Sequence, residues 1–150
     1  MRKTCFLFGH ADAPQSLLPL LVETIENELS KGVTEFYVGY HGNFDRLASS
    51  ALRQVKQRNN ITATLVLAYH PAEQPVELSW GFDGTFYPPL EKTPRRYAIV
   101  KSNQYMVKSS DSIICYVKHC GNARQLLNCA LQQNNVAINN LAMKNVENMI

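Results

Sequence analysis

Short apolar runs alternate with helical patterns along most of this chain. Five runs are apolar or rich in β-branched residues and too short for helices, and each predicts a β-strand: 5–8, 36–39, 62–69, 113–117 and 136–138. Between them, apolar residues recur every three or four positions, which predicts one helix in each of four intervals: 17–31, 43–58, 97–109 and 123–131. Ser16 is expected to cap the first helix, and Gly32 to end it.

This alternation predicts an α/β fold, a three-layer doubly wound Rossmann-like domain with a mainly parallel sheet. We expect about five strands in the order 3-2-1-4-5, with one domain over residues 1–150. Residues 70–96 contain five prolines and lose periodicity, which predicts a long loop. The tail at 141–150 fits either a terminal helix or an interface between copies of the chain.

Composition narrows the class of protein. With 45% hydrophobic residues the chain is globular, and a net charge of +3 is too small to favour binding of nucleic acid. No apolar segment is long enough for a secretion signal or a membrane span. The four cysteines lack the spacing of a zinc site. We therefore expect a cytosolic protein with reduced thiols, no metal site and no resident cofactor.

All four histidines follow predicted strands directly or within three residues. They are His10, His41, His70 and His119. In a parallel sheet the carboxyl ends of the strands share one edge, where ligands bind at the point of strand-order reversal. The predicted order makes His10 and His119 flank that crevice, and leaves His70 to one side. Imidazole can donate to phosphate, transfer a proton or bind a metal, although a histidine at a strand end can equally be an ordinary loop residue.

Glycines and charged residues near the same edge suggest contacts to a phosphorylated ligand. Gly9 and Gly121 precede predicted helices, where glycine lets phosphate approach backbone N–H groups, or simply makes a tight turn. Asp45 can bind ribose hydroxyls or stabilise a helix N-terminus. The basic pair Arg95–Arg96 can bind phosphate or remain a solvated surface.

A set of short motifs recurs in order across roughly residues 4–142, and together these motifs resemble a known family. The residues are Phe8-Gly9-His10, Tyr37-Val38-Gly39, His41 to Asp45, Phe82 to Thr85, Tyr87-Pro88, Leu90-Glu91, Pro94, Asn103, Met106-Val107, Ser110-Asp111, Cys115 to Val117 and Asn139 to Ala142. They are similar to small bacterial and phage proteins of the SLOG superfamily. That group includes phosphoribohydrolases acting on cytokinin riboside monophosphates, DNA-processing proteins that bind single strands, and sensor domains for nucleotide-derived signals.

The resemblance implies a Rossmann-like fold with a pocket for a nucleotide or nucleotide sugar. Carried over residue by residue, it implicates Gly9, His10, Gly42, Phe44, Asp45, Asn103, Met106, Asp111 and Gly121. Arg96 and Asn122 lie beside these motifs and complete our set of nucleotide-binding candidates. Three positions depart from the family pattern: Ala11 and Ser102 replace arginines, and Cys120 replaces a glycine.

The favoured hypothesis is a module that binds a nucleotide or nucleotide-derived small molecule at the carboxyl edge of the sheet, with a role as a sensor. The alternative is an enzyme that cleaves an N-glycosidic bond of a nucleotide. Such hydrolysis needs a carboxylate, so Asp45 or Asp111 would serve, with His10 or His119 as the proton donor. A minor alternative is binding of single-stranded DNA through Arg95–Arg96 and the aromatic side chains Trp80, Phe82 and Tyr87. A homo-oligomer is compatible with every one of these functions.

Overall fold

The computed structural model describes residues 3–78, 81–133 and 136–143. Within them, six parallel strands form one sheet in the order β4-β3-β2-β1-β5-β6. The strands are β1 (Lys3–Gly9), β2 (Val33–Val38), β3 (Thr62–Val66), β4 (Gly84–Phe86), β5 (Ser112–Tyr116) and β6 (Ala137–Asn140). The chain reverses its direction of travel across the sheet after β4, so the switch point lies between β1 and β5.

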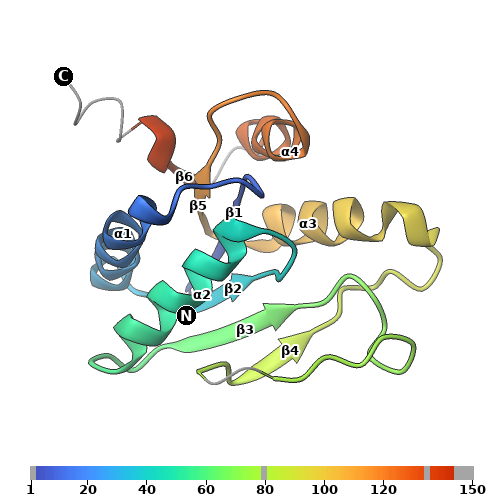
Figure 1. Cartoon of the computed structure of the whole chain (residues 1–150), viewed down its shortest axis with the longest axis horizontal. Helices are drawn as coiled ribbons and strands as arrows, with labels where there is room; N and C mark the ends of the chain where they lie inside the picture. Colours follow the sequence, from blue (N-terminus) through green and yellow to red (C-terminus); the bar gives the residue numbers. More distant parts are fainter. Residues whose placement is uncertain (1–2, 79–80, 134–135, 144–150) are drawn as a thin grey trace.

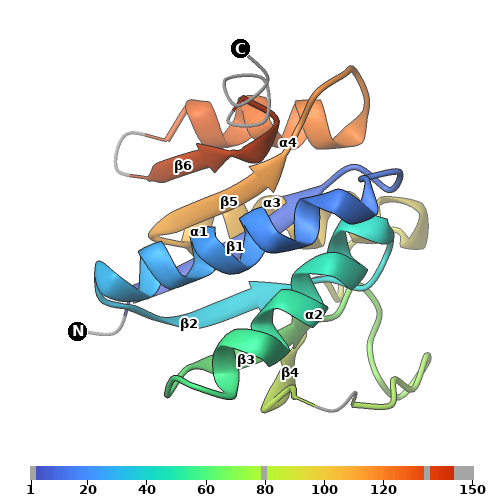
Figure 2. The same cartoon turned by 60° about the vertical axis from the view of Figure 1, so that its left-hand side comes forward.

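Helices cover both faces of the sheet. They are α1 (Leu18–Ser30), α2 (Asn43–Lys56), α3 (Ala98–Ser109) and α4 (Asn122–Leu131), with short 3-10 turns at Gln15–Leu17 and Arg95–Tyr97. α1 and α2 pack together on one face, and α3 and α4 pack together on the other (Figure 1). Figure 2 shows α1 and α2 in front of the sheet, with α3 behind it. The predicted three-layer Rossmann-like α/β fold is confirmed.

Alternate side chains of each central strand enter opposite cores. In β1, Cys5 and Leu7 pack under α1 and α2, while Phe6 and Phe8 pack under α3 and α4. Ile114 and Cys115 divide in the same way in β5. Because both faces of such a strand are buried, its sequence is a continuous apolar run rather than an alternating one.

The prediction of five strands was wrong by one. Gly84–Phe86 lies inside the predicted loop at 70–96 and pairs with β3 as a sixth strand at the edge of the sheet. The Asp83 carboxylate fixes this pairing, since its Oδ2 accepts hydrogen bonds from Ala63 N and from Lys56 Nζ. The five predicted strands nevertheless keep their predicted neighbours, and the new strand extends their order by one place.

Two local predictions near the chain ends change as well. Ser16 does not cap α1 with its side chain, because a 3-10 turn precedes that helix and Leu17 takes the cap position. Residues 141–143 are helical, and Leu141 and Ala142 are buried in the core beneath α1 and α2. The remainder of the predicted tail, 144–150, lies outside the described residues, as does Trp80. No helix in the described part of the chain is long and apolar enough to cross a membrane.

Candidate functional site

A cavity of about 540 Å³ opens at the carboxyl ends of β1 and β5, on the face covered by α3 and α4. Its walls come from the end of β1, the first turns of α3, the β2–α2 turn and the loop that leads into α4. Eight of the predicted site residues line it: Gly9, His10, Gly42, Asp45, Asn103, His119, Gly121 and Asn122. The residues that share this cavity thus come from four separate parts of the chain.

Four other candidates lie outside the cavity lining. Phe44 is fully buried in the core beneath α1 and α2. Met106 lies on α3 with its side chain buried, and it lines a separate cavity of about 190 Å³. Arg96 is exposed and its guanidinium lies 4.9 Å from the centre of the Tyr97 ring.

Asp111 lies at the opposite edge of the sheet from the cavity. It directly precedes β5, so it stands at the amino end of that strand. Its carboxylate accepts hydrogen bonds from Thr4 N at 2.9 Å and Thr4 Oγ1 at 3.3 Å, near the amino end of β1. Asp111 therefore joins two strands and lies outside this cavity.

The three glycines of the site differ in the space around them. A Cβ on Gly9 would lie 2.6 Å from the Phe44 ring, and a Cβ on Gly42 would lie 2.8 Å from the Ala11 Cα. Both glycines are therefore needed for packing within the protein. Gly121 has a φ of +140° and no atom near its Cβ position. Of the three, Gly121 alone leaves open space for a ligand at a helix N-terminus.

That helix N-terminus presents unpaired backbone donors. Gly121 is the N-cap of α4, and the first hydrogen bond into the helix runs from Gln125 N to Gly121 O. The N–H groups of the first helical turn precede this bond and have no carbonyl partner inside the helix. Asn122 and Ala123 from this turn line the cavity. The N-terminus of α4 therefore offers partial positive charge and hydrogen-bond donors to a ligand.

His10 joins the two loops that border the switch point. Its side chain is 5% exposed, and Nε2 accepts hydrogen bonds from Lys118 N at 2.9 Å and His119 N at 3.3 Å. Nε2 therefore carries no proton, and in the neutral ring Nδ1 carries it. Burial is the main cause that lowers the pKa of His10, with the neighbouring His119 second. His10 thus keeps its neutral form, with Nδ1–H as a donor that has no partner among the described residues.

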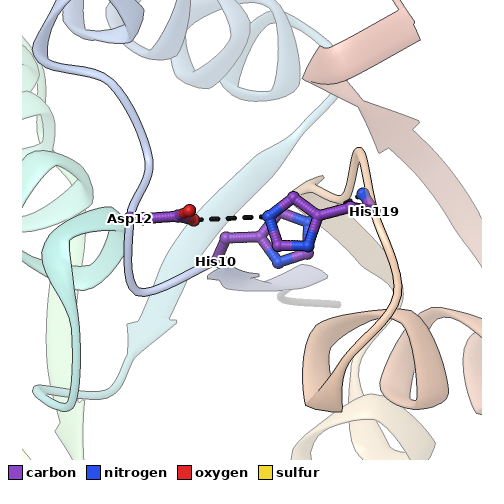
Figure 3. Close-up of side chains that lie close together, drawn as sticks. All are labelled: His10, Asp12 and His119. Carbon is purple, nitrogen blue, oxygen red and sulfur yellow. Dashed lines mark hydrogen bonds and ion pairs between the residues drawn. The ribbon is translucent and has the colours of Figure 1, made fainter.

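His119 and Asp12 lie beside His10 at the rim of the cavity (Figure 3). The His10 and His119 rings stack with their centres 3.7 Å apart and their planes 6° from parallel. His119 Nδ1 lies 2.9 Å from Cys120 O, and Nε2 lies 3.5 Å from Asp12 Oδ1. Both ring nitrogens of His119 therefore face oxygen atoms, one from its own loop and one from the β1–α1 loop.

This trio brings three metal-binding side chains within reach of one another, with their nearest donor atoms inside 4.8 Å. A metal ligand must offer a free lone pair. The lone pair of His10 Nε2 is used by two N–H groups, and Nδ1 is protonated in that tautomer. His10 would have to break both backbone hydrogen bonds to bind an ion, so the geometry disfavours a metal here.

Asp45 lies in the first turn of α2, directly after the β2–α2 turn. Its Oδ2 accepts a hydrogen bond from His41 N at 2.8 Å. Burial raises the pKa of Asp45 to about 6, and the hydrogen bond from His41 offsets part of that effect. The carboxylate therefore lines the cavity but is turned toward its own loop.

Sequence reasoning missed several of the residues that line the cavity. The missed residues are Phe6, Leu7, Phe8, Asp12, Gly39, Ile99, Val100, Gln104, Ala123, Gln125 and Leu126. Ile99 and Val100 lie one helical turn before Asn103 on α3, which was the available signal. The three positions that depart from the family pattern have different surroundings. Ala11 and Cys120 line the cavity, whereas Ser102 is buried and its Oγ donates to Leu67 O.

Comparisons with known proteins identify this fold in solved structures. No protein-family model matches the sequence, and no curated protein matches it. The molybdenum cofactor binding protein from the phototrophic bacterium Rippkaea orientalis has a TM-score of 0.64 at 16% identity, over 99% of this chain and 85% of that chain. The Moco carrier protein from Chlamydomonas reinhardtii has a TM-score of 0.56 at 14% identity, over all of both chains. At these identities the likeness shows a shared fold.

Proposed function

We propose that this protein binds a nucleotide or a nucleotide-derived small molecule in the cavity at the carboxyl ends of β1 and β5. The observation that carries the proposal is a pair of unpartnered donor sites facing one cavity. One is the open N-terminus of α4 at Gly121, and the other is Nδ1–H of His10. The donors at the N-terminus of α4 are exposed, so a ligand that enters the cavity can accept from them in place of water.

The other walls suit a flat heterocycle. Phe6, Phe8, Ile99 and Leu126 supply apolar surface, and the cavity volume is within the range of small-molecule sites. Asn103 is half-buried and its side chain makes no hydrogen bond within the described part of the chain. Its amide can pair with the polar edge of a base or pterin, because it offers both a donor and an acceptor.

The anionic part of the ligand would bind at the N-terminus of α4. No lysine or arginine is among the described residues that line the cavity. Phosphate would therefore be held by backbone N–H groups and the helix dipole. This interaction is weaker than a charge-assisted one, which is worth about 1.5–3 kcal/mol, so we expect moderate affinity.

The two similar structures narrow the ligands to test. Both are described as proteins that bind or carry molybdenum cofactor, a nucleotide-derived small molecule. The donors at α4, His10 and Asn103 could hold the pterin and phosphate of such a ligand, so it belongs in the panel. A role as a sensor, membership of the SLOG superfamily and a cytosolic location are part of the same proposal.

The test is mass spectrometry of small molecules that co-purify with the protein, followed by calorimetric titration. The titration panel is nucleoside mono-, di- and triphosphates and molybdenum cofactor. We expect saturable binding that Asn103→Ala weakens about tenfold, since it removes one or two hydrogen bonds to the ligand. Asn128→Ala is the matched control, because Asn128 is exposed on α4 and lies outside the cavity lining. Equal affinity of both variants for the ligand would contradict the proposed site.

The hydrolase alternative has less support. Asp111 lies at the other edge of the sheet, and Asp45 accepts a hydrogen bond from its own loop. The DNA-binding alternative relies on Arg95–Arg96 and the aromatic side chains near them. The Arg95 guanidinium lies 4.5 Å from the centre of the Tyr69 ring and 3.9 Å from the Glu73 carboxylate, and the Arg96 guanidinium lies 4.9 Å from the centre of the Tyr97 ring. Release of free base from a nucleoside monophosphate would show that the protein is a hydrolase and not a binding module alone. Binding of single-stranded DNA that weakens steeply with salt would favour the DNA-binding alternative.

A further inference from the structure

A second cavity, of about 660 Å³, lies on the α2 side of the β2–α2 turn. It shares Ala11, His41, Gly42 and Asp45 with the first cavity. These residues form the wall between the two, because Asn43 N donates to Ala11 O and closes the turn against the first loop. The second cavity is therefore a neighbour of the proposed ligand site, and its chemistry is different.

Its distinguishing feature is a polar stripe on α2. Arg46, Ser49 and Arg53 are spaced by three and four residues, so they lie on the same side of the helix, and all three line the cavity. The first cavity has no lysine or arginine in its described lining. The cationic side chains that phosphate recognition usually requires thus lie next to the first cavity, across the β2–α2 turn.

Both arginines keep donors available. Arg46 is exposed and makes no hydrogen bond or ion pair within the described residues. Arg53 is half-buried, its aliphatic stem lies against Gly81, and Nη2 donates to Ser50 Oγ at 3.2 Å. The stem contact positions the Arg53 guanidinium, and its remaining N–H groups have no partner among the described residues. Ser49 Oγ already donates to Asp45 O at 2.9 Å, so the two guanidinium groups supply the donors that an oxyanion needs.

Two carboxylates line the same cavity and oppose an anion. Asp45 Oδ2 accepts a hydrogen bond from His41 N at 2.8 Å, so this carboxylate is turned toward its own loop. Glu77 is exposed and lies on the loop that faces α2. Neither carboxylate forms an ion pair with Arg46 or Arg53 among the described residues, so the arginine charges are not neutralised by direct contact.

We infer that the second cavity is an oxyanion site, in which Arg46 and Arg53 bind a phosphate group. The phosphate is either free inorganic phosphate or the terminal phosphate of a ligand whose heterocycle occupies the first cavity. The chemistry of recognition is the same for both sources. The site itself does not depend on the proposed function, because Arg46 and Arg53 do not line the first cavity. Only the second source, a ligand whose heterocycle occupies the first cavity, rests on that function.

Titration calorimetry with inorganic phosphate and pyrophosphate, at constant ionic strength and pH 7.5, tests this site. We expect saturable binding to the wild type and a loss of at least about tenfold in affinity for the variant Arg46→Gln with Arg53→Gln. Arg58→Gln is the matched control, because Arg58 is exposed beyond the end of α2 and does not line the cavity. Glu77→Gln should raise the affinity severalfold by removing a repelling charge.

Absence of saturable phosphate binding to the wild type, or equal affinity of the double variant, would overturn the site. If the double variant fails to fold, Arg46→Gln alone decides, because its exposed side chain has no partner to lose. A repeat titration at saturating nucleotide then identifies the source. In one outcome, a nucleotide displaces phosphate from the wild type, but phosphate still binds to Asn103→Ala in the presence of that nucleotide. This outcome shows that the site holds the terminal phosphate of the bound nucleotide. Phosphate that is not displaced marks a site for the free anion.

Discussion

At the scale of single residues, His10 combines a structural and a binding role. Its Nε2 accepts two backbone hydrogen bonds from the β5–α4 loop, and its Nδ1 is left for a ligand. One ring therefore holds the loop that precedes α4 and presents a donor to the cavity. A histidine is suited to this task because its two nitrogens take opposite hydrogen-bonding roles in the neutral ring.

We expect His10→Ala to lower the free energy of unfolding by about 1–3 kcal/mol, because two N–H groups lose their acceptor. Urea denaturation at pH 7.5 measures this loss. His119→Ala is the control, since it removes the exposed ring of the stacked pair but keeps the His119 backbone N–H. Equal stability of the two variants would show that the hydrogen bonds to Nε2 contribute little.

Asp45 makes stability depend on pH, with a sign opposite to that of a paired carboxylate. Burial raises its folded-state pKa from 3.8 to about 6, so the folded protein holds this proton more tightly than the unfolded chain. The contribution of Asp45 to stability is therefore present below about pH 4 and lost as the pH rises through about 6. Asp45→Asn mimics the protonated form and still accepts from His41 N.

We expect Asp45→Asn to be more stable than the wild type by about 1–3 kcal/mol at pH 7, and equal to it near pH 3.5. Denaturant titrations at several pH values measure the difference. It should grow between pH 4 and 6 and stay constant above pH 7. A difference that does not change with pH would mean that Asp45 is fully solvated and that its pKa is ordinary.

At the scale of elements, the contact between β1 and α2 fixes one wall of the site. Phe44 fills the space above Gly9, where a Cβ would lie 2.6 Å from its ring. Gly9→Ala should therefore destabilise the protein by about 1–3 kcal/mol through overpacking. In a Phe44→Leu background the same change should cost less, and a double-mutant cycle measures this coupling. Equal costs in both backgrounds would contradict direct contact as the reason for glycine here.

The same elements show what the sequence can and cannot predict. The runs that form β1 and β5 are recognisable because both faces are buried, and parallel strands bring their carboxyl ends to one edge. β4 is not recognisable, since three residues carry no periodicity and depend on contacts from Asp83 to Lys56 and Ala63. Asp111 was implicated through its place in a family motif. It stands before β5 instead of after it, so it lies at the amino end of that strand and away from the cavity.

The glycines mark a second limit of sequence reasoning. Gly9, Gly42 and Gly121 all lie between a strand and a helix, and the sequence predicts the same role for each. The space around them differs because Phe44 and Ala11 occupy it in two cases, whereas Gly121 is open. Which side chain fills such a space depends on how two distant turns pack, and local sequence does not record that packing.

At the scale of the whole molecule, the four thiols report on folding and on the site together. Cys5 and Cys115 lie in the central strands, and burial raises the pKa of each to about 12. Cys129 is half-buried, and Cys120 is exposed at the rim of the first cavity. Because thiolate and access both control reaction rate, we expect Cys120 to react first with a disulfide reagent, and the two strand cysteines to react only after global unfolding.

The rate at Cys120 then tests the central proposal without an assay of activity. A ligand at the N-terminus of α4 would cover the thiol that precedes Gly121, so a saturating nucleotide should slow the reaction of Cys120 severalfold and leave Cys129 unchanged. Mass spectrometry of peptides separates the two sites, and Asn103→Ala should raise the nucleotide concentration that half-protects Cys120 about tenfold. Equal slowing at both cysteines would instead indicate that the ligand stabilises the whole fold from another site. The pattern of protection therefore distinguishes occupancy of this cavity from binding elsewhere on the molecule.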